Sequence, residues 1–179
     1  MKTKRIVLIG GPGTGKTSLL NELQNRGFTC YEEVSRQVTK AAQEQGIAQL
    51  FLSEPLKFSE LLLEARIEQH KQVGKESSEL VFIDRGIPDV LAYMDYAKSK
   101  YPEHFEKAAE NYRYDHVFSL APWEAIFESD NERYENFEQA QDIHQFILKS
   151  YENYGYHSIA VPFDSVSARA DFLLNILNK

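Results

Sequence analysis

Short apolar runs alternate with amphipathic patterns along the whole chain. Runs rich in β-branched and aromatic residues predict buried strands at 5–9, 28–31, 79–83, 115–120 and 157–161. Apolar residues at three- and four-residue spacing predict helices at 16–26, 34–44, 55–73, 89–99, 103–112, 122–128, 137–154 and 165–177. Strands that alternate with helices in this way favour a parallel sheet covered by helices on both faces.

The pattern therefore predicts a three-layer α/β fold with a five-stranded parallel sheet, for which we expect the order 2-3-1-4-5. The sequence contains no linker-like stretch, fixed-period repeat or low-complexity tract, so we expect one domain over residues 1–179. A small lid is expected near 122–136. Ligands of such sheets bind at the carboxyl ends of the strands, where the candidate chemistry is sought below.

Composition narrows the class of protein only a little. The 179 residues carry a net charge of −7, which argues against a nucleic-acid partner because such binding needs a basic face. The only cysteine, Cys30, cannot form a disulfide within the chain, so a cytoplasmic location is expected. No apolar stretch is long enough to predict a transmembrane segment. The oligomeric state cannot be inferred.

The strongest motif is a glycine-rich loop between the first strand and the first helix. The segment Gly10–Thr17 matches G-x-x-x-x-G-K-[ST] in full, with a strand before it and a helix after it. In such a loop, backbone N–H groups and the lysine bind phosphates, and the Thr17 hydroxyl binds Mg²⁺. We therefore predict ATP and Mg²⁺ as cofactors, with the nucleotide held by Gly11, Pro12, Gly13, Thr14, Gly15, Lys16, Thr17 and Ser18.

An acidic residue, Asp84, ends the apolar strand over 79–83. Beside a P-loop, such an acid faces the metal or accepts a substrate proton; as an alternative, Asp84 is a turn or cap residue. The next residue is Arg85, not the glutamate that activates water in motor-type ATPases. The Asp-Arg pair instead resembles nucleoside and nucleotide kinases, in which an arginine after this strand approaches the bound phosphates or the acceptor, and this resemblance favours phosphoryl transfer to a second molecule.

Charged residues also follow the second strand. Glu33 is a candidate to hold an acceptor hydroxyl and take its proton, and Arg36, three residues later, is a candidate to bind the acceptor or the transferred group. The alternative is an ordinary acidic helix start with an exposed ion pair.

Three further features have both a structural and a functional interpretation. Arg133, the only arginine of the polar stretch 129–136, is a candidate lid cation that stabilises the transferring phosphoryl group; the alternative is a solvated loop. Arg169, after the last strand, is expected at the surface or in an ion pair; the alternative is a ligand of the nucleotide. Tyr93 and Tyr96 are expected to pack in the core; the alternative is that they stack on a substrate.

Several of these blocks together resemble a known family. They are the loop at 10–17, Glu-Glu-Val-Ser-Arg at 32–36, Asp-Arg-Gly at 84–86, Glu-Arg-Tyr-Glu at 132–135, and Val-Pro…Ser-Val-x-x-Arg at 161–169. The chain resembles an AAA-labelled family of small P-loop ATPases, which is similar to the nicotinamide riboside kinase domain of bacterial NAD-biosynthesis regulators. The resemblance implies a kinase-like core with a lid, Glu33 and Arg36 at the acceptor side, Asp84 and Arg85 by the phosphates, and Arg133 in the lid.

Two functions follow as hypotheses. The first is an ATP- and Mg²⁺-dependent kinase of a small hydroxylated metabolite such as a nucleoside, with Lys16, Glu33, Asp84 and Arg133 as catalytic residues. In it Thr17 and Asp84 hold the metal, and Glu33 or Asp84 takes the proton. The second is an ATP- or GTP-dependent switch that acts on a protein or lipid partner.

Overall fold

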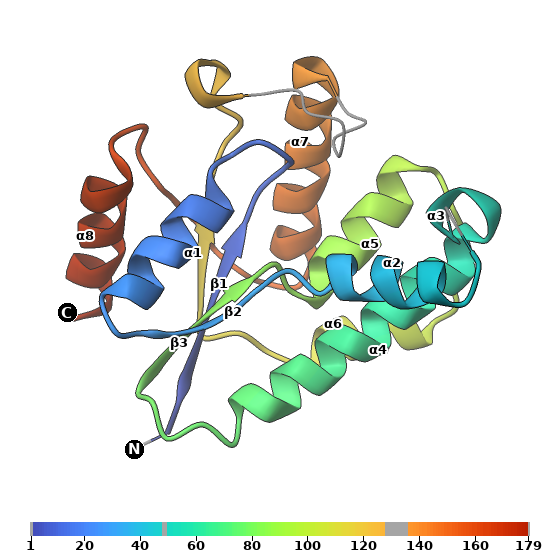
Figure 1. The fold of residues 1–179 in the computed structure, drawn as a ribbon, viewed down its shortest axis with the longest axis horizontal. Coiled ribbons are helices and arrows are strands. Elements are labelled where there is room, and N and C mark those ends of the chain that lie inside the picture. Colours follow the sequence, from blue (N-terminus) through green and yellow to red (C-terminus); the bar gives the residue numbers. More distant parts are fainter. Residues whose placement is uncertain (1, 48–49, 128–135, 179) are drawn as a thin grey trace.

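The computed structural model describes residues 2–47, 50–127 and 136–178 (Figure 1). Five strands form its sheet: β1 (Lys4–Ile9), β2 (Thr29–Tyr31), β3 (Leu80–Asp84), β4 (His116–Ser119) and β5 (Ile159–Ala160). Neighbouring strands in this sheet pair in parallel, and the order β2-β3-β1-β4-β5 confirms the predicted 2-3-1-4-5 arrangement.

The helices follow the predicted pattern, with one addition. They are α1 (Lys16–Asn25), α2 (Ser35–Glu44), α3 (Leu50–Ser53), α4 (Pro55–Val73), α5 (Ile87–Tyr96), α6 (His104–Asn111), η1 (Glu124–Ile126), α7 (Phe137–Asn153) and α8 (Val166–Leu177). The short helix α3 was not predicted. No helix in the described part of the chain combines the length and apolar character that a membrane crossing requires.

The central strand buries both of its faces because successive side chains point to opposite sides of a strand. Ile6 and Leu8 pack in the core cluster under α1 and α8, and Val7 and Ile9 pack in the cluster under α5 and α7. The two helical layers lie on opposite sides of β1 in Figure 1, as a three-layer fold requires. The predicted fold class is therefore confirmed.

Several predicted boundaries are wrong by a few residues. The last strand is limited to Ile159–Ala160 because it pairs only with the end of β4. The helix predicted at 122–128 is a single 3₁₀ turn at Glu124–Ile126. Of the predicted lid, only residues 122–127 and 136 are described, and Arg133 lies outside the described residues.

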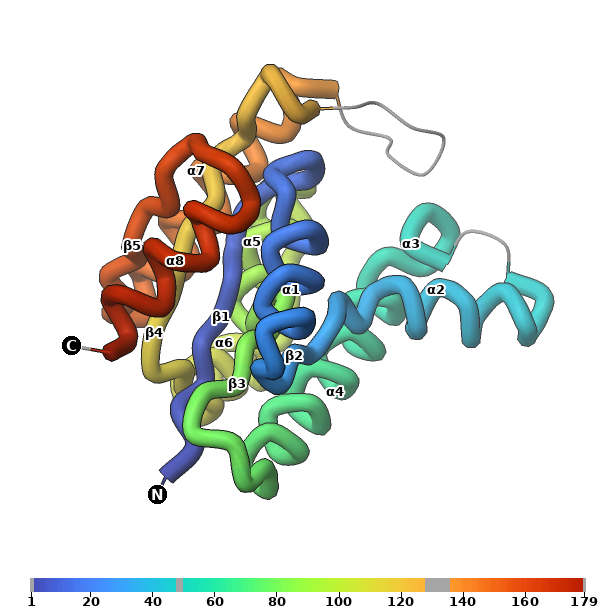
Figure 2. Tube along the Cα trace, turned by 60° about the vertical axis from the view of Figure 1, so that its left-hand side comes forward, coloured from blue at the N-terminus to red at the C-terminus, as the bar shows by residue number. Residues whose placement is uncertain are grey.

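The start of α2 matters more for function. Because the helix begins at Ser35, Glu33 lies before it, so Glu33 and Arg36 do not lie on one face of the helix. The carboxyl ends of β1, β2 and β3 lead directly into the glycine-rich loop, into Glu33 and into Arg85. Figure 2 shows that α2, α3 and the start of α4 extend away from the sheet.

Candidate functional site

The glycine-rich loop forms a cradle at the end of β1. Gly13 (φ 70°) and Gly15 (φ 81°) adopt left-handed backbone conformations that other residues rarely adopt. A Cβ on Gly15 would also lie 2.9 Å from the guanidinium of Arg169. Thr14 is buried and its hydroxyl donates to the Gly11 carbonyl at 3.3 Å. The loop is therefore tightly curled, in the way that lets successive N–H groups face an anion.

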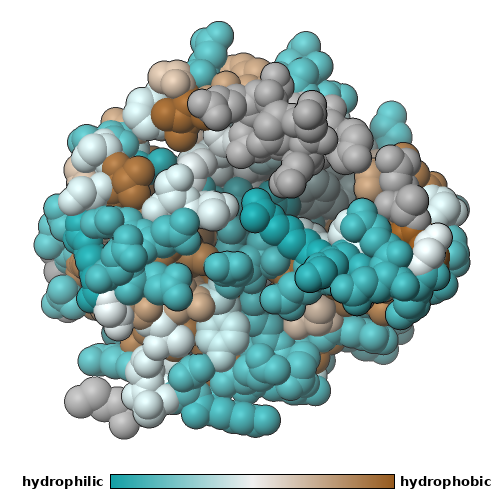
Figure 3. Space-filling view, in the orientation of Figure 1, coloured by the Kyte–Doolittle hydropathy of each residue, from teal (hydrophilic) through white to brown (hydrophobic). Residues whose placement is uncertain are grey.

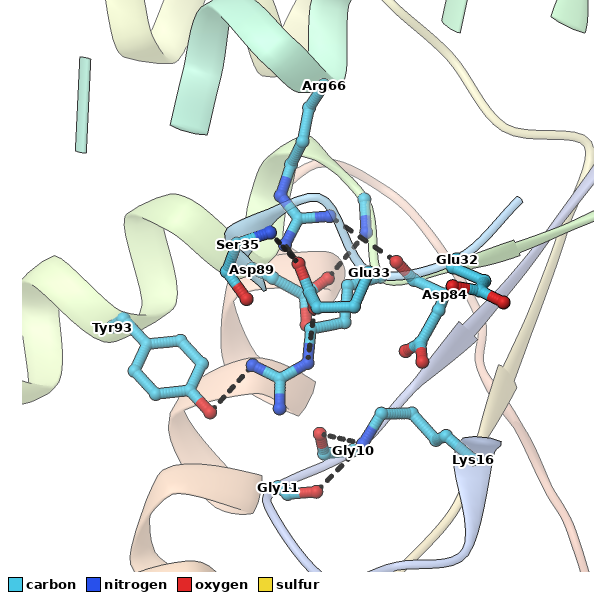
Figure 4. Close-up of polar contacts among 12 residues, drawn as sticks. Gly10, Gly11, Lys16, Glu32, Glu33, Ser35, Arg66, Asp84, Asp89 and Tyr93 are labelled. Atoms are coloured by element: carbon cyan, nitrogen blue, oxygen red, sulfur yellow. Dashed lines mark hydrogen bonds and ion pairs between the residues drawn. The ribbon is translucent and has the colours of Figure 1, made fainter. Parts of the chain in front are cut away.

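Lys16 lies across this cradle. Its Nζ donates to the carbonyls of Gly10 (3.0 Å) and Gly11 (2.9 Å) and to the hydroxyl of Thr14 (3.2 Å), as Figure 4 shows for the two carbonyls. Burial lowers the pKa of Lys16 to about 8, and repulsion from Arg85 adds to this shift while nearby carboxylates oppose it. The ammonium is thus desolvated and held where a phosphate would receive its charge.

This pKa predicts a pH-dependent affinity for nucleotide. A triphosphate favours the ammonium form of Lys16, so affinity should be constant below about pH 8 and fall by up to about tenfold per pH unit above it. In the free protein the folded state binds fewer protons than the unfolded state between pH 8 and 10.5, so the contribution of Lys16 to stability rises with pH there. Titration of a fluorescent ATP analogue from pH 6 to 10 measures the affinity.

The matched control is Lys16→Arg, since a guanidinium keeps its charge over this range. Its affinity, whatever its absolute value, should not change with pH. An equally flat profile for the wild-type protein would contradict the assignment of Lys16 as the titrating group.

A second charged group lies at the ends of β2 and β3. Glu33 Oε1 accepts from Arg66 Nη2 at 2.7 Å and from the Ser35 backbone N–H at 3.0 Å, and Oε2 lies 3.0 Å from Arg85 Nε (Figure 4). The Arg85 contact has the geometry of an ion pair, not of an aligned hydrogen bond. Burial would raise the pKa of Glu33, but attraction to Arg66 and Arg85 outweighs it and lowers that pKa. Glu33 is therefore a fixed carboxylate anion.

Arg85 adopts an unusual backbone conformation. Its φ of 66° is rare for a residue other than glycine and costs about 1–3 kcal/mol. Its N–H donates to the Leu8 carbonyl at 3.0 Å, and its Nη1 donates to the hydroxyl of Tyr93 at 2.7 Å. These contacts hold the guanidinium between Glu33 and Tyr93, and Arg85 lines the same cavity as the cradle residues. Strain of this kind is typical of functional sites.

Asp84 is a buried carboxylate without a full set of partners. It is 4% exposed, and its Oδ1 accepts no hydrogen bond within the described residues. Burial raises the pKa of Asp84, and the ammonium of Lys16 only partly opposes this shift. Asp84 and the exposed Thr17 line one cavity, so a buried oxygen anion and a hydroxyl are available to a hard cation there.

These two oxygens fit Mg²⁺. In the described ranges no group of three or more His, Cys, Asp or Glu residues could hold a metal ion. Magnesium does not need such a group, because in phosphate sites it is held by one or two side chains together with the phosphates and water.

Two cavities meet beside the cradle and the charged residues at the ends of β2 and β3. The first, of about 240 Å³, is lined by the cradle residues Pro12 to Ser18 and by Glu33, Ser35, Arg36, Asp84 and Arg85. The second, of about 470 Å³, lies between α2, α4 and α5 and has mostly apolar walls. Pro12, Ser35 and Arg85 line both cavities. The face in Figure 3, which is mainly hydrophilic, is hollowed near its centre.

The structure brings most of the predicted site residues together. Lys16, Thr17, Glu33, Asp84 and Arg85 all line the smaller cavity, as do the exposed Ser18 and Arg36. The alternative interpretation of Glu33 and Arg36 as an exposed ion pair is wrong for Glu33, which pairs with Arg66 and Arg85 instead. Arg133 lies outside the described residues, so its predicted role in the lid stays a prediction.

The prediction for Arg169 is wrong. Arg169 is not at the surface: it is 2% exposed and its Nη2 donates to the Thr14 carbonyl at 3.2 Å, under the cradle. Tyr93 and Tyr96 pack against the core cluster under α5 and α7, as predicted, and both also line the larger cavity.

Sequence reasoning missed Arg66 and Asp89, which are 3% and 1% exposed. The buried residues of α4 are Leu63, Arg66, Gln69 and Val73. These residues repeat at helical spacing and include two polar ones. Polar residues on a helical stripe that otherwise contains leucine and valine were the sequence signal that could have identified Arg66 as a buried, functional residue.

The fold and the cradle define a P-loop nucleotide-binding protein with the architecture of small kinases. The chain belongs to the family described as "AAA domain", whose model matches residues 5–169. A search of curated proteins found no match.

Solved structures with this fold include two enzymes of similar length. Deoxyadenosine kinase from M. mycoides, solved with products dCMP and dCDP, is 16% identical with a TM-score of 0.71 over 97% of this chain and 98% of that chain. Thymidylate kinase from Candida albicans is 16% identical with a TM-score of 0.72 over 99% and 92%. The NadR protein in complex with NR is 16% identical with a TM-score of 0.74, and this chain, 99% covered, spans 51% of it.

Proposed function

We propose that the chain is an ATP- and Mg²⁺-dependent kinase that phosphorylates a hydroxyl group of a small metabolite such as a nucleoside. One observation carries the proposal. A second, larger cavity opens onto the phosphate cradle and shares Pro12, Ser35 and Arg85 with it. A nucleotide-dependent switch or a simple hydrolase needs no such cavity, whereas a transferase needs room for an acceptor beside the γ-phosphate.

The cradle would hold the triphosphate. Backbone N–H groups of Gly13, Gly15 and Lys16 and the Lys16 ammonium would bind phosphate oxygens. Thr17 and Asp84 would hold Mg²⁺, and Asp84 would do so through water. The ion, when bound, supplies positive charge that neutralises the β- and γ-phosphate oxygens. The unpartnered oxygen and raised pKa of Asp84 support this role, because a cation completes a desolvated anion.

The acceptor hydroxyl would lie at the junction of the two cavities. Glu33, already ionised by its two arginine partners, would accept a hydrogen bond from that hydroxyl and take its proton. The acceptor oxygen forms a new bond to the γ-phosphorus as the bond from phosphorus to the β–γ bridging oxygen breaks, and ADP leaves. A weak base suffices because the transition state is loose and little negative charge must be removed from the nucleophile early.

Cations would stabilise the charge on the phosphoryl group in transit. Arg85 lies at the junction, and Arg36 lines the cradle cavity. Arg133 stays a candidate lid cation on sequence grounds alone, and the single domain with a lid near 122–136 also stays a prediction. The kinases among the structures of the same fold support a kinase over other P-loop classes, through fold likeness.

A coupled assay tests the proposal. With ATP and Mg²⁺, we expect formation of ADP to depend on an added acceptor from a panel of nucleosides, other hydroxylated metabolites and their monophosphates, with the phosphorylated product identified by mass spectrometry. The control is the same panel without ATP. Slow ADP formation that no acceptor accelerates, together with tight retention of nucleotide, would instead support a nucleotide-dependent switch.

A further inference from the structure

Asp89 is a buried carboxylate in the wall of the larger cavity that the proposed chemistry does not use. It is 1% exposed. Its Oδ2 accepts from the Gly86 backbone N–H at 2.8 Å and from the Tyr151 hydroxyl at 2.7 Å. Its Oδ1 is buried and has no hydrogen-bond partner in the described part of the chain. An unmatched, buried carboxylate oxygen is costly, so it points to a partner that the chain itself does not supply.

Helix capping does not account for this oxygen. Asp89 is the third residue of α5, where its side chain caps the backbone N–H of Gly86. That interaction uses Oδ2 alone. A neutral side chain such as asparagine would cap the helix as well and would not bury a charge. The second oxygen of Asp89 is therefore left for a group inside the cavity.

The rest of the cavity wall indicates what kind of molecule can bind. Arg66 and Arg85 are the only Lys or Arg side chains among the described residues that line it, and both are paired with Glu33, at 2.7 and 3.0 Å. Among the described residues of this wall, Asp89 is the only acidic one. A phosphate or carboxylate deep in the cavity would thus face the Asp89 carboxylate beside two guanidiniums whose charge Glu33 already balances in part.

Most of the wall is apolar or aromatic. Its apolar and aromatic residues include Phe58, Leu62, Val90, Tyr93, Met94 and Tyr96. The Nε of Arg66, also in this wall, is buried without a hydrogen-bond partner in the described residues. Among the described residues of this wall, Asp89 Oδ1 is therefore a buried acceptor and Arg66 Nε a buried donor that both lack a hydrogen-bond partner. A flat heteroaromatic ring with an amino or amide edge has the complementary groups.

We infer that the acceptor is a neutral heteroaromatic alcohol, bound through an N–H donor to Asp89 Oδ1, and that Asp89 selects it over analogues without that donor and over phosphorylated analogues. This inference rests on the proposed function and specifies its substrate class. Discrimination of this kind is strong because an analogue without the donor leaves the buried carboxylate oxygen unpaired.

Matched nucleosides test the inference without altering the protein. Adenosine carries an exocyclic amino group and purine riboside lacks it, so the wild-type protein should favour adenosine, or another amino-bearing member of such a pair, by about 10–100-fold in kcat/KM. The 5′-monophosphate of the preferred nucleoside should be a poorer ligand than the nucleoside. A preference for purine riboside or for the monophosphate would overturn the inference.

Asp89→Asn tests the residue itself. The Gly86 N–H and the Tyr151 O–H are both donors, so the amide oxygen should face them and the amide NH₂ should face the cavity. The substitution keeps the shape of the side chain and replaces an acceptor by a donor. The preference for the amino-bearing nucleoside should fall at least tenfold, whereas the affinity for ATP should stay unchanged.

The matched control is Tyr151→Phe, which removes a hydrogen bond to Oδ2 and leaves Oδ1 in place. It should lower thermal stability but keep the nucleoside preference. Equal loss of preference in both variants, or none in Asp89→Asn, would show that Asp89 only supports the fold.

Equilibrium binding separates failure of this inference from failure of the proposed function. Thermal shifts with a non-hydrolysable ATP analogue and each nucleoside report binding without turnover. Asp89-dependent binding of the amino-bearing nucleosides without any phosphoryl transfer would overturn the kinase proposal and support the inference. Binding of none of the neutral probes would overturn the inference, even if another acceptor were phosphorylated.

Discussion

Replacing Lys16 with alanine is expected to abolish the rise in thermal stability that ATP and Mg²⁺ confer, and to slow phosphoryl transfer by about 10²–10³-fold or more. The ammonium is the cation that the cradle itself places against phosphate oxygens, since its Nζ lies 2.9–3.0 Å from two loop carbonyls. Its lowered pKa shows that burial works against the charged form in the free protein. We therefore expect the free variant to be no less stable than the wild type.

Thermal-shift measurements with and without nucleotide check this. At a hundredfold excess over its dissociation constant, a ligand adds about 2.7 kcal/mol of apparent stability, which gives a readily measured shift for the wild type. Lys40→Ala, at an exposed position of α2, is the matched control and should keep the full shift. If Lys16→Ala also kept the full shift, the nucleotide would have to bind away from the glycine-rich loop.

The sequence predicts the cradle well because its interactions are local. The loop, the lysine and the helix start lie within eight consecutive residues, so spacing alone determines which groups can face a phosphate. The strand order was also predictable, because alternating strands and helices permit few right-handed parallel arrangements. The end of β3 placed Asp84 and Arg85 beside the cradle for the same reason.

The acceptor side depends on contacts between distant segments, and there sequence reasoning was incomplete. Glu33 and Arg66 are 33 residues apart, and only the packing of α4 beside the ends of β2 and β3 brings them to 2.7 Å. Asp89 and Tyr151 are 62 residues apart and meet because α7 packs on α5. Arg169 reaches Thr14 across 155 residues. Residue type and helical spacing cannot specify such partners, although polar residues on a buried stripe indicate that partners exist.

Replacing Glu33 with glutamine has the second largest expected effect, because it acts on both catalysis and stability. If Glu33 takes the acceptor proton, as we propose, its loss should reduce kcat by about 10²–10⁴-fold. Loss of its charge also leaves the buried guanidiniums of Arg66 and Arg85 without their anion, which should cost about 3–5 kcal/mol of unfolding free energy. Steady-state kinetics, at a temperature where circular dichroism shows the variant to be folded, and urea denaturation measure the two effects.

A comparison with Asp84→Asn separates the roles of the two carboxylates. If Asp84 binds Mg²⁺ through water, its neutralisation should raise the Mg²⁺ concentration needed for half-maximal rate by about 10–100-fold, because an outer partner of a metal has effects of that size. The variant should be at least as stable as the wild type near neutral pH, since the raised pKa of Asp84 means that the fold disfavours its charge. Glu33→Gln should leave the Mg²⁺ requirement unchanged. A shifted Mg²⁺ requirement in Glu33→Gln, together with an unshifted one in Asp84→Asn, would reverse the two assignments, because the carboxylate that responds to the metal concentration is the one that faces the metal.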